Sequence, residues 1–170
     1  DNRNTITLYD ENENFLDEDV AYAKLPWTYN FWEEGILFPD QNAPYYMYFD
    51  DPNTWQFIKL SVDYNVATQN HINKVYDDIT ILNQVGRTLD DFLKNYQISG
   101  EYENSGVFTC GDLWLVATLY DKNGKVVGVN DVRTDSDNLE PGETSNFAID
   151  INTHGEVAYY QLLYYAINKD

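Results

Sequence analysis

ATLYDKNGKVV, residues 117–127, is the stretch that decides the fold class of this chain. The apolar run Leu113–Tyr120 leads into a polar turn, and Lys125–Val129 leads out of it. Asn123 and Gly124 both tolerate a positive φ, so this pair between two apolar runs is a strong β-hairpin signal. We therefore predict two antiparallel strands joined by this turn.

Strand patterns continue on both sides of the hairpin. Residues 144–151 alternate, and we expect Phe147, Ile149 and Ile151 to face a core. Further strands are predicted at residues 5–9, 79–82, 96–102 and 157–167. The one helix-like stretch, Thr88–Tyr96, is too short for more than a turn or two. The sequence therefore predicts an all-β protein.

The hairpin motif occurs twice. Leu8-Tyr9-Asp10 precedes a polar turn and an apolar pair, as Leu119-Tyr120-Asp121 does at a spacing of 111 residues. Pro39 and Pro141 head a second matching segment at a spacing of 102, so the first copy holds nine extra residues. Self-similarity at a fixed spacing indicates repeated structural units. We predict two copies of one β unit, at residues 1–70 and 77–170.

The second copy resembles the FxLYD domain, an immunoglobulin-like β-sandwich module of bacterial and archaeal secreted and lipoprotein chains. The residues that carry the resemblance are Leu119-Tyr120-Asp121, Asn123-Gly124, Val126-Val127, Leu139-Glu140-Pro141-Gly142-Glu143 and Phe147, with Ala117 standing where the family has Phe. The resemblance implies two immunoglobulin-like β-sandwich modules in tandem, in a prokaryotic protein that is extracellular or at the cell surface. It implies no catalytic residues.

The first copy departs from the family pattern. It keeps Leu8-Tyr9-Asp10 but has Pro39-Asp40-Gln41 in place of Pro-Gly-Glu. About forty residues with two predicted strands precede Leu119 in the second copy, whereas seven residues precede Leu8. We therefore expect the N-terminal module to lack its first strands.

Composition excludes several functions. A net charge of −19 disfavours nucleic acid as a partner, since phosphates require basic patches. Aromatic residues make up 16% of the chain, which disfavours disorder. No apolar run is long enough to span a membrane, so we expect no membrane insertion. Residues 1–10 lack the apolar core of a signal peptide, so if the protein is exported we expect its signal or anchor upstream.

Catalytic and metal-binding motifs are not recognisable. Cys110 is the only cysteine, so neither a disulfide nor a cysteine-based zinc site can form within the chain. His71 and His154 are far apart in sequence. We predict no enzyme activity and no cofactor. Calcium is the one metal that the acidic loops would suit, above all the loop with Asp131, Asp135, Asp137 and Glu140.

An aromatic insertion is the main candidate for an interaction surface. It holds four aromatic residues within Leu25–Trp32, and a further tryptophan follows: Trp27, Tyr29, Phe31, Trp32 and Trp55. Exposed aromatic rings bind sugars and anchor protein interfaces. The same rings would equally cover the open half of an incomplete sandwich.

The sequence thus favours a non-catalytic structural or assembly module, completed by strands of a neighbouring chain. The partner would be a second copy or another surface protein, because unpaired strand edges are templates for added strands. The alternative is a carbohydrate- or ligand-binding module that uses the exposed aromatic residues.

Overall fold

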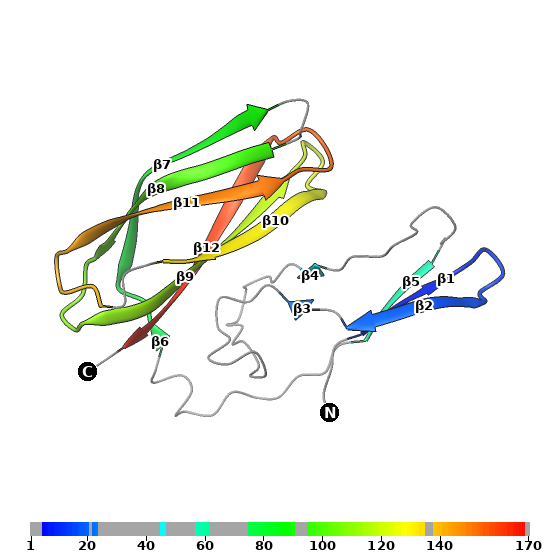
Figure 1. Cartoon of the computed structure of the whole chain (residues 1–170), viewed down its shortest axis with the longest axis horizontal. Helices are drawn as coiled ribbons and strands as arrows, with labels where there is room; N and C mark the ends of the chain where they lie inside the picture. The colour runs from blue at the N-terminus through cyan, green and yellow to red at the C-terminus, as the bar shows by residue number, and fades with distance from the viewer. Residues whose placement is uncertain are drawn as a thin grey trace. The chain divides into compact units, whose positions relative to one another are not determined.

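The computed structural model describes residues 5–20, 22–23, 45–46, 57–61, 75–90, 95–134 and 138–168. Every helix or strand assigned within these ranges is a β-strand, so the predicted all-β class is confirmed for them. The chain separates into two compact units. Strands β1 to β5 belong to the first and strands β6 to β12 to the second (Figure 1).

The first unit contains a three-stranded antiparallel sheet. Its central strand β1 (Thr5–Tyr9) pairs with β2 (Phe15–Val20) and with β5 (Phe57–Ser61). Two short strands, β3 (Tyr22–Ala23) and β4 (Tyr45–Tyr46), pair with each other. The side chains of Thr7 and Leu8 in β1 point to opposite faces and are only 7% and 3% exposed, so both faces of the central strand are covered at this point.

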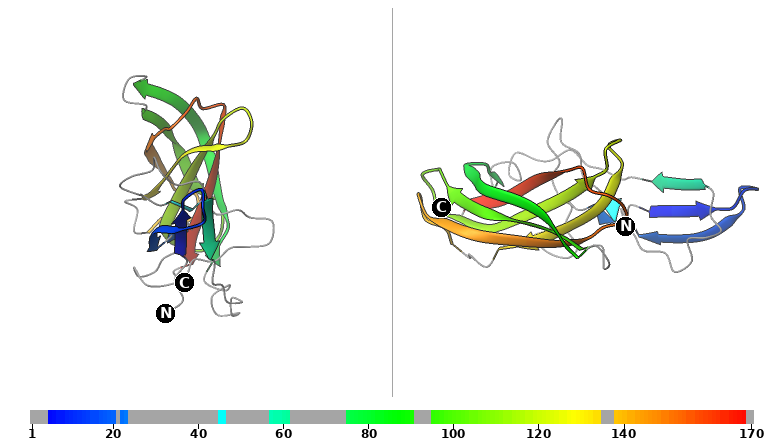
Figure 2. Two further views of the ribbon diagram at one scale, coloured as in Figure 1. Left: turned by 90° about the vertical axis from the view of Figure 1, so that its right-hand side faces the viewer. Right: turned by 90° about the horizontal axis from the view of Figure 1, so that it is seen from above.

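The second unit is formed by two antiparallel sheets that lie face to face (Figures 1 and 2). One sheet has the order β10-β9-β12-β6, with bounds Val126–Arg133, Cys110–Tyr120, Tyr159–Asn168 and Val75–Tyr76. The other has the order β11-β8-β7, with bounds Thr144–Asn152, Asn95–Asn104 and Ile79–Asp90.

The core of the second unit lies between these sheets. Leu115 and Leu119 of β9 are fully buried, and so is Ile98 of β8. On β11 the predicted inward residues are buried as expected: Phe147, Ile149 and Ile151. Each such side chain stabilises the fold by about 1.5–3 kcal/mol through its burial. Alternation along the strands therefore fixes which face of each sheet is covered.

The strand registers repeat between the two units. Tyr9 lies opposite Phe57 across β1 and β5, and Tyr120 lies opposite Tyr159 across β9 and β12. Tyr120 follows Tyr9 at the spacing of 111 residues, and Tyr159 follows Phe57 at the spacing of 102, so the two pairs correspond. Both hairpins also carry an irregularity at the same place, next to Tyr9 in one and opposite Tyr120 in the other. The order β2-β1-β5 thus reproduces β10-β9-β12.

The helix-like stretch is assigned wrongly by the sequence in those of its residues that the structure describes. Thr88–Asp90 ends β7, and Asn95 and Tyr96 begin β8; residues 91–94 lie outside the described ranges. A helix this short gains too few hydrogen bonds to offset its nucleation, whereas β7 gains a paired ladder with β8. Leu89, which the helix would have buried, is 47% exposed.

Candidate functional site

The hairpin turn of the second unit is organised by one carboxylate. Oδ1 of Asp121 accepts hydrogen bonds from the backbone N–H groups of Asn123 (2.8 Å) and Lys125 (2.9 Å). The Lys125 amide contributes most to holding the pKa of Asp121 below its ordinary value. Gly124 takes a φ of 81°, a conformation that glycine adopts without strain. The turn is therefore set by its own sequence.

The first unit has the same turn. Oδ1 of Asp10 accepts hydrogen bonds from the N–H groups of Asn12 (2.8 Å) and Asn14 (2.9 Å), and the Asn14 side chain donates to Oδ2 (2.9 Å). These bonds, above all that from the Asn14 side chain, lower the pKa of Asp10. Glu13 stands in the place of Gly124, with a φ of 62°. Both aspartates thus have a structural role as turn caps.

A ladder of apolar side chains crosses the sheet beside this turn. The rings of Tyr120 and Tyr159 stack with centroids 4.9 Å apart and an interplanar angle of 11°. The Tyr120 hydroxyl donates to Oε1 of Gln161 at 3.1 Å. Tyr159 is 47% exposed and Val126, opposite Tyr120, is 46% exposed. In the first unit Phe15 occupies the position of Val126 and is 62% exposed.

Strand β12 is paired unequally on its two sides. Its pairing with β9 runs from Tyr159 to Asn168, whereas its pairing with β6 is confined to Ala166 and Ile167. Within the described residues no strand pairs with the other side of Tyr159–Tyr164, which we call the open edge of β12. Alternate residues of this edge direct their N–H and C=O groups away from β9.

A buried hydrogen-bond centre fixes β6 at the end of this edge. Asn104 is fully buried, and its Nδ2 donates to the carbonyl groups of Phe108 and Leu139, both at 2.8 Å. Its Oδ1 accepts hydrogen bonds from the Tyr76 hydroxyl (2.8 Å) and the Gly106 N–H (3.1 Å). Four bonds satisfy the whole amide, which is the condition for burying it at little cost. The sequence predicted a strand before this residue, but not the hydrogen-bond centre at its end.

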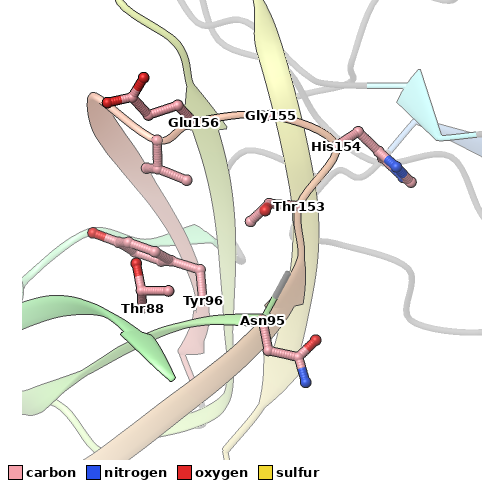
Figure 3. Close-up of a pocket in the computed structure, with 8 residues that line it drawn as sticks. Thr88, Asn95, Tyr96, Thr153, His154, Gly155 and Glu156 are labelled. Carbon is pink, nitrogen blue, oxygen red and sulfur yellow. The ribbon is translucent and has the colours of Figure 1, made fainter. Parts of the chain in front are cut away.

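A shallow hollow of about 740 Å³ lies where β7, β8 and the β11–β12 connection meet. It is lined by Thr88, Asn95, Tyr96, Thr153, His154, Gly155, Glu156 and Val157. Burial raises the pKa of the Tyr96 hydroxyl, with a smaller effect from Tyr160. Figure 3 shows the side chains of His154 and Glu156 directed away from Tyr96 and from each other. The polar groups therefore do not converge on one point, as an acid–base site requires.

The remaining chemically distinctive residues are dispersed. His154 is exposed, and Cys110 is 1% exposed within the core. Among the described residues no three His, Cys, Asp or Glu side chains gather where they would hold a metal ion. His71, Asp135 and Asp137 lie outside the described ranges. In the described part of the chain there is also no helix with the length and apolarity to cross a membrane.

The predicted aromatic surface falls outside the described residues; this applies to Trp27, Tyr29, Phe31, Trp32 and Trp55. The open edge of β12, by contrast, was not anticipated. The sequence did carry a signal for it, since residues 159–168, YYQLLYYAIN, include no charged side chain.

Comparison with protein-family models and with curated proteins finds no match to this sequence.

Proposed function

We propose that this protein is a non-catalytic structural and assembly module of the extracellular space or cell surface, related to FxLYD domains. In this proposal both units are immunoglobulin-like, and strands of a neighbouring chain complete the first. The observation that carries the proposal is the shared register of β2-β1-β5 and β10-β9-β12. Because the two sheets have matching strand registers, we expect the same face of each sheet to pack against a second layer of strands.

The second unit shows what covers that face. The inner face of β9 packs against the sheet β11-β8-β7, where Leu119 is fully buried. The counterpart of Leu119 in the first unit is Leu8, which this chain alone already buries to 3% exposure, so strands from a neighbour would extend an existing cover. At the spacing of 102 residues Tyr45 of β4 corresponds to Phe147 of β11, yet β4 pairs with the short β3. Among the described residues of the first unit no strand corresponds to β7 or β8.

Strand addition is an established way for one chain to complete another. The added backbone supplies hydrogen bonds along an edge, and alternate side chains fill the apolar face. Tandem units with one complete and one incomplete sheet would link neighbouring molecules in series. The net charge of −19 is in keeping with a highly solvated protein surface.

The proposal is tested by fusing the strands that, in this proposal, the first unit lacks to its own N-terminal side. A copy of residues 75–115, which contain β6, β7 and β8, is placed directly before Thr5. If the first unit needs these strands, amide hydrogen exchange in Thr5–Tyr9 slows by about tenfold or more, because local opening then has to break a packed sandwich.

The matched control carries Ile98→Asp and Tyr102→Asp in the added copy alone. Both side chains are buried in β8, at 0% and 1% exposure, so the altered copy cannot pack. Equal exchange rates in β1 with the intact and the altered copy would refute the proposal.

A further inference from the structure

The open edge of β12 differs from the other sheet edges of the second unit. Edge strands in soluble proteins are ordinarily protected by charged side chains, bulges or covering segments. Strands β10, β11 and β7 each carry charge: Asp131 and Arg133, then Asp150, then Arg87 and Asp90. Strand β12 carries no charged residue over its ten positions, in a chain with 29 acidic side chains.

A second protective device also distinguishes β7 from β12. The register of β7 shifts between Leu82 and Val85, and Asn83 there takes a φ of 51°. Such a bulge bends an edge and interrupts pairing with an incoming strand. The register of β12 against β9 is regular from Tyr159 to Tyr165. The open edge is therefore regular and carries no charged side chain of its own, and among the described residues no strand pairs with it; exposed Asp77 and Asp78 lie at its Tyr164 end, where the Tyr164 hydroxyl donates to the Asp77 carbonyl at 2.6 Å.

We propose that the open edge of β12 pairs antiparallel with the open edge of β12 in a second copy of this chain. The pairing forms a continuous sheet with the order β10-β9-β12-β12-β9-β10. It rests on the assembly role proposed above, but it uses an edge of the second unit and none of the strands of the first. A two-fold contact of this kind needs one self-complementary patch.

The geometry of the edge fits its own copy. Residues opposite each other in an antiparallel pair share a face of the sheet, so a two-fold axis perpendicular to the sheet must lie midway between the two copies of one residue. An axis at Leu162 sets Tyr160 opposite Tyr164 and Gln161 opposite Leu163. Tyr160 and Tyr164 are half-buried against the core, so the apolar face continues across the junction.

The register is limited at one end by β6, which already occupies Ala166 and Ile167. With the axis at Leu162, the paired segment in each copy is Tyr160–Tyr164, which ends before the residues held by β6. Electrostatics also favour this partner, because two chains of net charge −19 repel each other except where they present no charge. A strand without charged side chains is where a second copy meets the least repulsion, which is greatest at the Tyr164 end because Asp77 and Asp78 lie close to it.

The test is the self-association of the 170-residue chain, measured by light scattering and sedimentation over a range of concentrations. We expect dimers whose affinity rises with salt, since salt screens repulsion between the two acidic chains. Gln161→Glu and Gln161→Lys should each weaken the dimer by about tenfold or more, because each sets like charges beside the axis. Glu also keeps an oxygen for the Tyr120 hydroxyl, so this variant retains the fold.

The matched control is Asn146→Glu, which adds the same charge at an exposed position of the edge strand β11 and should leave the dimer unchanged. A monomer at every concentration, or a dimer that neither Gln161 variant weakens, would overturn the inference. Association that disappears only when residues 75–115 precede Thr5 would assign assembly to the first unit and overturn pairing through β12. Weakening by the Gln161 variants with unchanged exchange in β1 would support β12 pairing and reject completion of the first unit.

Discussion

Asn104 accepts a 2.8 Å hydrogen bond from the hydroxyl of Tyr76, and both side chains are buried. Tyr76 is one of the two residues of β6, and Asn104 ends β8. The bond therefore joins the edge of one sheet to the end of a strand in the other. It fixes β6 beside Ala166 and Ile167, and so sets where the open edge of β12 stops.

We expect Asn104→Ala to lower the free energy of unfolding of the second unit by about 3 kcal/mol. The substitution removes four hydrogen bonds at a fully buried position, two donated to the carbonyl groups of Phe108 and Leu139 and two accepted from Tyr76 and Gly106, and each lost bond costs about 0.5–1.5 kcal/mol. Urea unfolding measures the change. Asn146→Ala, at an exposed position of β11, is the control and should remain within about 0.5 kcal/mol of the parent; an equal loss in both variants would contradict the assignment.

Buried tyrosines should make the second unit sensitive to alkali. Burial raises the pKa of Tyr76 and of Tyr165 above the ordinary value of 10.0. The neutral hydroxyl is favoured in the folded state, so its contribution is complete below pH 10.0 and is lost as pH rises above it. Unfolding in urea, measured on either side of this pH, should show falling stability, and tyrosinate absorbance should appear together with unfolding. If all tyrosines ionised near the ordinary pKa and the fold were kept, the predicted sensitivity to alkali would be wrong.

The two turn aspartates should give the opposite dependence at acid pH. The pKa of Asp10 and of Asp121 is lowered by hydrogen bonds to the carboxylate. Their contribution is therefore complete above the ordinary value of 3.8 and is lost as pH falls through the lower folded-state value. Asp10→Asn with Asp121→Asn should flatten the decline in stability between about pH 5 and about pH 2. An unchanged slope would show that other carboxylates govern the acid response.

Glu13 and Gly124 occupy one position of the repeated turn, and only one of them is suited to it. A residue with a Cβ loses about 1–2 kcal/mol in the left-handed region, which glycine enters without this loss. Since glycine also makes the unfolded chain more flexible, we expect Glu13→Gly to stabilise the first unit by about 0.5–1 kcal/mol. The reciprocal change Gly124→Ala should destabilise the second unit by a similar amount. Thermal unfolding measures the change in stability of each variant. Destabilisation by Glu13→Gly would indicate that the Glu13 side chain stabilises the turn by its own contacts.

Much of the fold follows from local sequence. The hairpin at Asn123-Gly124 forms where the turn residues predict it, and Phe147, Ile149 and Ile151 face the core as their alternation indicates. The spacings of 111 and 102 residues anticipated which strands pair in the same register. Thr88–Tyr96 was assigned wrongly because a short apolar pattern fits a helix and a strand equally well until pairing decides. Residues Thr88–Asp90 form a strand because they extend the hydrogen-bonded ladder between β7 and β8.

The sequence by itself determined the strands, the turn caps and the repeat, because these depend on the φ preferences, alternation and hydrogen bonds of residues close together in the chain. Only the tertiary structure decided that Tyr76 reaches Asn104 and that β6 covers two residues of β12. The order of strands in a sheet depends on which distant segments bury apolar area together, and no local pattern records that choice. The absence of charge in residues 159–168 was readable from the start, but it acquired a meaning only when one side of β12 was seen to be open.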